Sequence, residues 1–444
     1  MSIHVKLKQL ILLFGDIAVL YASFFLTLTL RYQGIPDVIL ETHFVPFTII
    51  FGIWLLGFYI GGLYDLSFLK NDLAFSRSFT TLVFINGVIA TILFYFIPAF
   101  VITPKINLFI VVLLSGLGGY IWRSFYNNIL SAGGPVNRIL MIGYNKTVEE
   151  LADHIGKNPQ LGYEISFWMK EGLQDKEFDH LAQIILNSKI NLIVVPAHIK
   201  KNSKAARLIY KNMVSGIEVW DLAALYEKVF QKLPLAELEE VWFLENLSKS
   251  HKIYEFFKRP IEFLLAVVFS VVLLPVSILI SILIALTSRG PIIYKQTRSG
   301  QNEHDFMIYK FRTMQFDAEK SGPQWAVTKD SRVTTIGKIL RKSHLDELPQ
   351  LWNIIRGELS FVGPRPERPE FVSQLKKDVP YFELRLLVRP GITGWAQINY
   401  KYGASIEDAY EKLQYDMYYL KNRSLALDFL ILLRTVKYLF TSHK

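Results

Sequence analysis

Two adjacent carboxylates, Asp346 and Glu347, are the residues of this chain whose type and spacing favour chemistry. They lie in the string SHLDELPQLW, residues 343–352. A second string, LSFVGPRPERPEF, follows a short way along the chain and carries Arg365 and Arg368. Adjacent carboxylates suit a division of labour in which one attacks an electrophile and the other holds a metal ion. The arginines would neutralise an anionic substrate such as a phosphate.

The same carboxylates also fit a purely structural interpretation. Ser343 and Asp346 have the spacing of a capping box, in which each side chain bonds the backbone N–H of the other residue. Pro349 suits the first turn of a helix, where its missing N–H removes no helical hydrogen bond. On these residues alone Asp346 and Glu347 start a helix, so the rest of the chain has to decide between the two interpretations.

Cations recur beside turns between residues 295 and 400. They are Lys310 and Arg312 in YKFRTM, Arg332, Arg341 and Lys342 in KDSRVTTIGKILRKS, Arg365 and Arg368 in VGPRPERPEF, and Arg389 in RPGITGW. Prolines on both sides of Arg365 fix the backbone there, which favours a guanidinium held ready for a phosphate. Mg²⁺ binds in proteins through one or two carboxylates plus substrate phosphates, and Asp346 or Glu347 would provide such a ligand. These residues together indicate a site where phosphates meet a metal ion.

The first part of the chain, residues 1–125, has the composition of a transmembrane bundle. The whole chain of 444 residues is 51% hydrophobic and 14% aromatic, more apolar than an ordinary soluble protein. Four segments reach the roughly 20 residues that a span requires: 9–30, 44–64, 79–102 and 105–122. The residues that predict a cytoplasmic location for both ends of the bundle are Lys6, Lys8, Lys70, Arg77, Arg123 and Arg138. For Asp16 in the first span, a hydrogen bond within the bundle is preferred over a functional role.

The lack of cysteine and the excess of basic residues narrow the chemistry. Without cysteine there is no disulfide, thiolate nucleophile or cysteine-ligated zinc, so a nucleophile has to be oxygen or nitrogen. The net charge of +10 is concentrated in residues 251–444, where 28 Lys and Arg stand against 19 Asp and Glu. Such an excess suits lipid headgroups or phosphates. The sequence has no recognised nucleic-acid motif, so nucleic acid is not expected as a partner.

Residues 126–250 have the pattern of a Rossmann-like βαβ domain. NRILMIGY and INLIVVPA are typical of buried strands, and TVEELADHIGK and KAARLIYKNM of helices. A dinucleotide site would need G-x-G-x-x-G after the first strand, whereas GYNKTVEEL offers Gly143 alone. We therefore expect this domain to have a structural or regulatory role.

Residues 261–287 are apolar and long enough to cross a bilayer as one straight helix, yet two features favour a re-entrant helix. Pro275 interrupts the segment and predicts a kink. Basic residues flank both ends, with Lys258 and Arg259 before the segment and Arg289 after it, which predicts that both ends lie on the same membrane face. The final apolar stretch, LALDFLILLRTVKYLF, fits either an interfacial helix or a core helix of the soluble part.

Several of these strings together resemble the large monotopic polyprenyl-phosphate phosphoglycosyl transferases. They are KRPIEF, LTSRGPIIYKQTRSG, KFRTM, DSRVTTIGKILRKSHLDELPQLWNIIRGELSFVGPRPE and RPGITGWAQIN. The resemblance runs almost continuously over residues 250–444, and the two earlier domains resemble the N-terminal half of the longer members. It implies a mostly helical monotopic catalytic domain over residues 251–444, held on the cytoplasmic face of the bacterial inner membrane.

The resemblance also implies an activity and its residues. In that family an aspartate attacks the β-phosphorus of a UDP-sugar, releases UMP and passes the sugar phosphate to undecaprenyl phosphate, which initiates exopolysaccharide or O-antigen synthesis. Carried over, Asp346 is the nucleophile, and Glu347, with Asp346, binds Mg²⁺. The expected phosphate- and substrate-binding residues are Lys310, Arg312, Arg332, Gln350, Arg365 and Arg368. A homodimer is compatible with this assignment.

The re-entrant segment departs from the family pattern in two places. Glu262 stands where the family usually has aspartate, and we expect it to pair with Arg259. The break is Leu274-Pro275 instead of Ser-Pro, which removes a hydroxyl that would satisfy the backbone at the kink.

Two other functions remain open. A glycosyltransferase that moves only the sugar would release UDP, but its D-x-D motif or separated carboxylates are not found near the cations. A non-catalytic scaffold for polysaccharide assembly would not need an intact pair of Asp346 and Glu347. The residues do not identify the sugar, and a neutral hexose is preferred only because it is frequent in the family.

Overall fold

The computed structural model describes most of the chain. The residues that it describes are 3–65, 69, 71–96, 105–132, 137–169, 184–185, 187–196, 217–247, 251–315, 332–400, 403 and 405–441. They form two compact units, Met1–Val229 and Phe230–Lys444.

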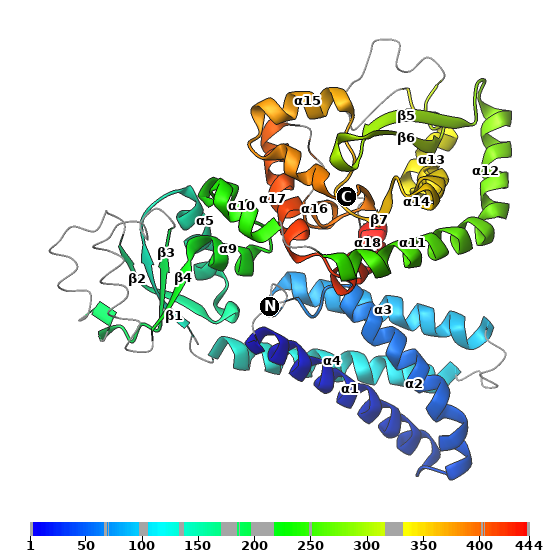
Figure 1. Cartoon of the computed structure of the whole chain (residues 1–444). Coiled ribbons are helices and arrows are strands. Elements are labelled where there is room, and N and C mark those ends of the chain that lie inside the picture. Colours follow the sequence, from blue (N-terminus) through cyan, green and yellow to red (C-terminus); the bar gives the residue numbers. More distant parts are fainter. Residues whose placement is uncertain are drawn as a thin grey trace. The chain divides into compact units, whose positions relative to one another are not determined.

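Four long helices open the first unit (Figure 1): α1 (Ile3–Tyr32), α2 (Asp37–Ile60), α3 (Leu73–Phe96) and α4 (Lys105–Ala132). All four are long and apolar enough to cross a membrane, which confirms the four predicted apolar helices. α2 ends at Ile60, before the predicted end at residue 64, and residues 97–102 of the third predicted span lie outside the described part of the chain. Their inner faces bury an aromatic core that includes Phe24, Phe47, Phe51 and Trp54. Outward-facing apolar side chains remain exposed, as expected of helices whose solvent is lipid.

A buried ion pair crosses the bundle. The Asp16 carboxylate accepts hydrogen bonds from Arg123 Nη2 at 2.5 Å and from the Tyr64 hydroxyl at 2.7 Å. Asp16 and Arg123 are 3% and 1% exposed. The preferred interpretation of Asp16 is confirmed. The prediction that Arg123 lies outside the fourth span is wrong. Arg123 lies inside α4, where it forms an ion pair with Asp16.

The rest of the first unit is an α/β domain. Its strands β1 (Asn137–Ile142), β2 (Tyr163–Met169), β3 (Leu192–Val195) and β4 (Glu218–Asp221) form a parallel sheet in the order β2-β1-β3-β4. Helices α5 (Lys146–Lys157) and α9 (Leu222–Phe230) accompany the sheet. The predictions for β1, β3 and α5 are confirmed, β2 and β4 were not predicted, and the helix expected at KAARLIYKNM lies outside the described residues.

The turn between β1 and α5 contains a glycine with positive φ and a residue that caps the helix. Gly143 has φ of 93°, a left-handed conformation that favours glycine. Asn145 then caps α5, because its side chain accepts a hydrogen bond from the Val148 N–H at 2.9 Å. One of the first N–H groups of α5, which would meet a pyrophosphate in a dinucleotide site, is therefore satisfied by the chain itself.

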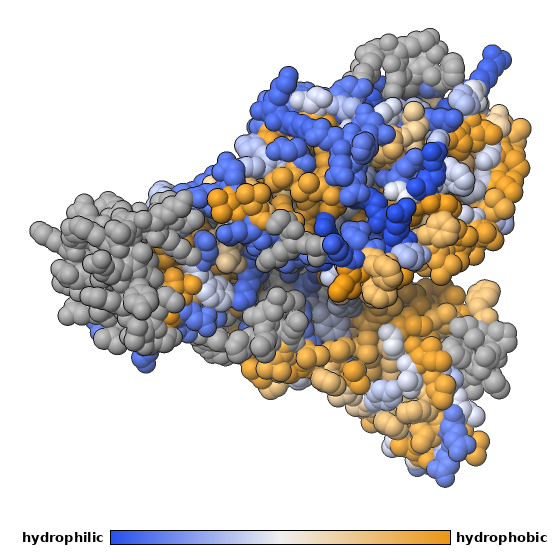
Figure 2. Space-filling model, viewed as in Figure 1, coloured by the Kyte–Doolittle hydropathy of each residue, from blue (hydrophilic) through white to orange (hydrophobic). Residues whose placement is uncertain are grey.

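The second unit contains a bent pair of apolar helices. After α10 (Glu240–Leu247), α11 (Lys252–Val272) and α12 (Leu274–Thr287) meet at an angle of 59°. The predicted bend is present, but its position needs correction: the break falls at Leu273, and Pro275 occupies the first turn of α12, where no helical N–H is lost. Figure 2 shows hydrophobic side chains gathered over α12, where Leu279 and Leu286 are among the exposed residues.

The rest of the second unit is built mostly from short elements (Figure 1). They are the antiparallel hairpin β5 (Ile293–Ser299) and β6 (Asp305–Phe311), α13 (Thr335–Ser343), the 3₁₀ helix η6 (Leu345–Gln350), α14 (Leu351–Arg356), the parallel strands β7 (Ser360–Val362) and β8 (Gly391–Thr393), α15 (Pro369–Asp378), the 3₁₀ helix η7 (Phe382–Leu387), α16 (Trp395–Asn399), α17 (Ile406–Asn422) and α18 (Leu425–Thr441). One core joins Ala266 of α11 to Ile308 and Ile354, and another joins Ile280 and Ile284 of α12 to Phe311.

Candidate active site

Asp346 and Glu347 lie on η6, directly after a sharp end of α13. The Ser343 hydroxyl donates to the carbonyls of Ile339 and Leu340, and His344 follows with φ of 54°. Ser343 therefore ends one helix and does not cap the next, so the capping-box interpretation is wrong. A left-handed residue turns the chain here and presents two carboxylates on a single short turn.

The Glu347 carboxylate lies between two cations. Its Oε1 accepts a hydrogen bond from Lys310 Nζ of β6 at 2.6 Å and another from Arg365 Nη2, in the loop after β7, at 2.8 Å. The side chain of Glu347 is only 10% exposed. Burial acts to raise the pKa of Glu347, but Arg365 and Lys310 outweigh it and hold that pKa well below its usual range. Glu347 is thus a fixed negative charge that aligns Lys310 and Arg365.

The neighbouring Asp346 is buried but not bonded. It is 8% exposed, and within the described parts of the chain no hydrogen bond reaches its carboxylate oxygens. Burial raises the pKa of Asp346, against the opposing charge of Lys310 and with the support of Glu347. The oxygen lone pairs of Asp346 are therefore available for attack on an electrophile. In Glu347, Oε1 already accepts hydrogen bonds from two cations.

The other predicted site residues divide into two groups. Gln350 is 2% exposed at the end of η6, and its amide nitrogen has no partner among the described residues. Arg368 precedes α15 as its N-cap, and its charge acts on Arg298 together with that of Arg365. Arg332 lies at the Met314–Val333 bridge. The structure thus brings Gln350 to the turn of the acid pair, and substrate binding by Arg332 and Arg368 stays a prediction.

Arg312 contacts the end of α12 in this structure, and its binding of substrate stays a prediction. Its guanidinium donates to the Pro291 carbonyl at 2.5 Å, to the Ser288 carbonyl at 2.8 Å and to the Ser288 hydroxyl at 2.7 Å. Arg312 is 6% exposed, so these bonds occupy most of its donors away from bulk water. It ties the end of α12 to the hairpin, whereas Lys310, two residues earlier on the strand, reaches Glu347.

A buried polar cluster fixes α11 beside the site. Lys258 Nζ donates to the hydroxyls of Tyr254 and Tyr419 at 2.8 and 3.0 Å and to the Val362 carbonyl at 2.8 Å, and lies 3.0 Å from Asp428 Oδ2. The cluster joins α11 to α17, α18 and β7. The Asp428 face of the last helix is therefore part of the core, the second of its two predicted alternatives.

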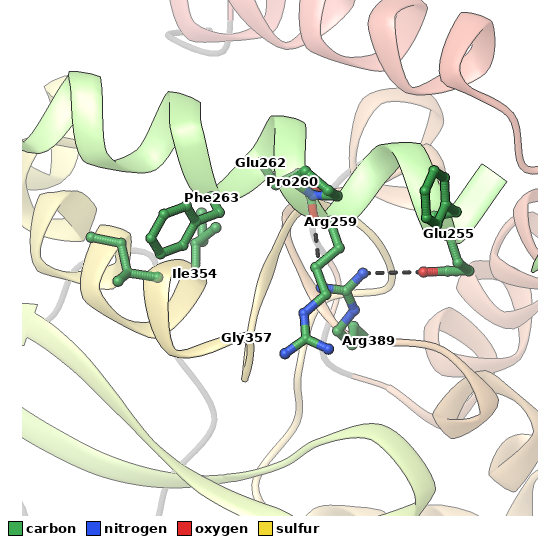
Figure 3. Close-up of a pocket in the computed structure, with 10 residues that line it drawn as sticks. Glu255, Arg259, Pro260, Glu262, Phe263, Ile354, Gly357 and Arg389 are labelled. Atoms are coloured by element: carbon green, nitrogen blue, oxygen red, sulfur yellow. Dashed lines mark hydrogen bonds and ion pairs between the residues drawn. The ribbon is translucent and has the colours of Figure 1, made fainter. Parts of the chain in front are cut away.

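The predicted pair of Glu262 with Arg259 is wrong. Glu262 Oε1 accepts hydrogen bonds from the Ser360 hydroxyl and from the Phe361 N–H, and the cations near it are Lys258 and Arg389, each at 3.8 Å. Figure 3 shows Arg389 reaching toward Glu255 and Glu262, with Arg259 beside it in the pocket. Arg259 is exposed and lines this cavity of about 530 Å³. Glu262 is i+4 from Lys258 on the buried face of α11, whereas Arg259 points from an exposed face.

The acid pair fits a metal site whose ligands come partly from the protein and partly from substrate phosphates and water. Among the described residues no three acidic or histidine side chains gather closely enough to hold a metal ion by themselves. Asp346 has both oxygens free of described donors, and Glu347 uses one oxygen for its two cations. This donor set matches Mg²⁺, which takes one or two protein carboxylates and completes its shell with phosphate oxygens and water.

Sequence comparisons relate this chain to known transferases. The profile of the family described as bacterial sugar transferase matches residues 253–442. A UDP-N-acetylgalactosamine-undecaprenyl-phosphate N-acetylgalactosaminephosphotransferase of Aeromonas hydrophila is 37% identical over 252 residues, 52% of this chain and 59% of that protein. UDP-glucose:undecaprenyl-phosphate glucose-1-phosphate transferases of Klebsiella pneumoniae and Caulobacter vibrioides are 29% and 36% identical over 340 and 189 residues. These alignments cover 73% and 42% of this chain, and each covers 70% of the relative.

The matched residues contain the acid pair, both of its cations and the polar cluster on α11. The alignment with the Caulobacter protein covers 70% of that protein, and 36% of the aligned residues are identical. The chain belongs to the bacterial sugar transferase family, the polyprenyl-phosphate phosphoglycosyl transferases.

Proposed function

We propose that this protein transfers a hexose 1-phosphate from a UDP-sugar to undecaprenyl phosphate, through a covalent sugar phosphate on Asp346. The observation that carries the proposal is the contrast within the acid pair. Glu347 is neutralised by Lys310 and Arg365, and Asp346 beside it is bare. The names of the Aeromonas, Klebsiella and Caulobacter relatives support the two substrate classes.

The first half-reaction uses Asp346 as the nucleophile. An Asp346 carboxylate oxygen attacks the β-phosphorus of the UDP-sugar and forms an acyl-phosphate bond. The bond between the β-phosphorus and the bridging oxygen breaks, and UMP leaves with its electron pair. Lys310 and Arg365, aligned by Glu347, stabilise the negative charge that moves onto the phosphate oxygens.

The second half-reaction restores the enzyme. A phosphate oxygen of undecaprenyl phosphate attacks the same phosphorus, and the bond to Asp346 breaks with its electrons returning to the carboxylate. The product is undecaprenyl diphosphate linked to the sugar. Mg²⁺ held by Glu347 or Asp346 would neutralise the pyrophosphate of the donor. No proton has to move at Asp346, so the raised pKa of this residue matters only through the fraction that is ionised.

The location of the acceptor requires the site to lie at the membrane surface. A lipid phosphate with a long chain keeps its headgroup at the interface, so α11 and α12 would enter the cytoplasmic leaflet and return at the bend near Leu273. The exposed apolar residues of both helices, Phe256 and Leu264 on α11 and Leu279 and Leu286 on α12, support this placement.

Product identity tests the proposal against a transferase that moves only the sugar. Purified protein in lipid nanodiscs receives undecaprenyl phosphate, Mg²⁺ and, in turn, UDP-glucose, UDP-galactose, UDP-N-acetylglucosamine and UDP-N-acetylgalactosamine. The proposal predicts UMP with at least one donor, with a neutral hexose preferred, and none from Asp346→Asn. Release of UDP would support the sugar-only reaction instead.

A further inference from the structure

The loop that carries Arg365 is tied down through its carbonyl oxygens. Two prolines in Pro364-Arg365-Pro366 have no N–H to donate, so the backbone can be fixed mainly by what its carbonyls accept. The Pro364 carbonyl accepts from the Gly391 N–H at 2.9 Å, and the Glu367 carbonyl from the Ser299 N–H at 2.9 Å. Strands β5 and β8 therefore hold the two ends of the loop.

Two arginine side chains hold the middle of the loop. Arg298 Nη1 donates to the Pro366 carbonyl at 3.0 Å, and Arg385 Nη2 donates to the Arg365 carbonyl at 2.9 Å. Arg385 is itself fixed by Asp416 of α17, whose Oδ2 lies 3.0 Å from the same nitrogen. The Arg385 and Asp416 side chains are 8% and 2% exposed, so this ion pair is buried beneath the loop.

We infer that Arg385 and Asp416 are positioning residues that set the placement of the Arg365 guanidinium against Glu347 and the donor phosphate. Arg385 touches the backbone of Arg365 and neither member of the acid pair. Arg385 makes both contacts through Nη2, so the Asp416 carboxylate that holds this nitrogen also fixes the direction in which it donates to the Arg365 carbonyl. The inference rests on the proposed role of Arg365 in phosphate binding.

The charge state of Asp416 adds a second readout. Burial raises the pKa of Asp416 to about 6, with Glu367 adding to the effect, while Arg385 and Lys412 oppose it. Above that pH the carboxylate is charged and holds Arg385 as an ion pair. Below it the neutral acid holds Arg385 less firmly, so the wild type comes to resemble an Asp416→Asn variant.

A double-mutant cycle tests the inference with the full chain in nanodiscs. UMP release is measured for the wild type, Asp416→Asn, Arg365→Ala and the double variant, with Lys376→Ala as control because it removes only the surface pair of Lys376 with Glu303. With Arg365 intact, we expect Asp416→Asn to lower UMP release by roughly 10- to 100-fold, because a small displacement of the Arg365 guanidinium near the reacting phosphate has an effect of this size. In the Arg365→Ala background it should cause no further loss.

The outcomes separate the inference from the proposed function. If Arg365→Ala is impaired and Asp416→Asn costs the same factor in both backgrounds, or nothing in either, the inference is overturned and the proposed function stands. If Arg365→Ala is as active as the wild type, the phosphate-binding role of Arg365 and the inference both fall, whereas the continued release of UMP still supports the proposed transfer. The activity ratio of wild type to Asp416→Asn should also rise between about pH 5 and pH 8, and a ratio independent of pH contradicts the inference. If Asp416→Asn folds poorly, Arg385→Lys takes its place in the cycle. This variant keeps the charge for Asp416 but not the planar guanidinium, and should give an intermediate loss of UMP release.

Discussion

Replacing Glu347 by glutamine removes one negative charge from the centre of the site and changes little else in shape. The carboxylate accepts two charge-assisted hydrogen bonds, from Lys310 at 2.6 Å and Arg365 at 2.8 Å. Each such bond contributes about 1.5–3 kcal/mol, and a neutral acceptor keeps about half of that. The two bonds together should then lose about 1.5–3 kcal/mol. At about 1.4 kcal/mol for each factor of ten, kcat/KM should fall roughly 10- to 150-fold.

The assay for Glu347→Gln is UMP release at increasing Mg²⁺. Part of the loss should be recovered at high Mg²⁺, because the variant also lacks a carboxylate ligand. Glu303→Gln is the matched control, since Glu303 is 61% exposed and its ion pair with Lys376 is a surface contact. A Glu347→Gln variant as active as the wild type would refute the idea that this carboxylate aligns the cations. A loss equal to that of Glu303→Gln would do the same.

Three further predictions concern acid pH, the α11 cluster and membrane topology. Burial raises the pKa of Asp346 above its ordinary value near 3.8, so single-turnover UMP release should decline as the pH falls through that raised pKa; a rate unchanged down to about pH 4 would contradict this. Lys258→Met leaves Asp428 buried without its cation and should cost about 3–5 kcal/mol, seen as a lower Tm in detergent than that of Lys376→Met; equal Tm values would show that the cluster is not structural. Single cysteines at Lys252 and Arg289, both exposed, should be labelled from the cytoplasmic face alone, and labelling from opposite faces would mean that α11 and α12 cross the membrane.

Local patterns predicted much of the fold because they depend on residues close in sequence. Apolar runs of sufficient length located α1 to α4, and alternation or continuous apolarity located β1 and β3. Pro275 correctly predicted a bend between α11 and α12 but not its position. A proline is tolerated in the first turn of a helix, so the break falls before it, at Leu273. The short strand β4, EVWD, carries too few residues for its pattern to be distinguished from a loop.

The partners of the site residues were harder to predict because they are distant in sequence. The adjacency of Asp346 and Glu347 was visible, but which of them meets Lys310 and Arg365 depends on the left-handed turn at His344. Glu262 bonds a segment 98 residues away instead of its neighbour Arg259. Nothing local distinguishes Arg385, which anchors the Arg365 loop, from an ordinary surface arginine, and only its burial beside Asp416 identifies it.

The most direct test of the account is whether Asp346 carries the sugar phosphate. Wild-type protein is incubated with a donor UDP-sugar and Mg²⁺, without lipid acceptor, then quenched and digested for mass spectrometry. We predict a hexose phosphate on the peptide that contains Asp346, one equivalent of UMP at most, and loss of the adduct when undecaprenyl phosphate is added. No adduct on that peptide under conditions where full turnover occurs with the acceptor, or full turnover by Asp346→Asn, would contradict the central claim.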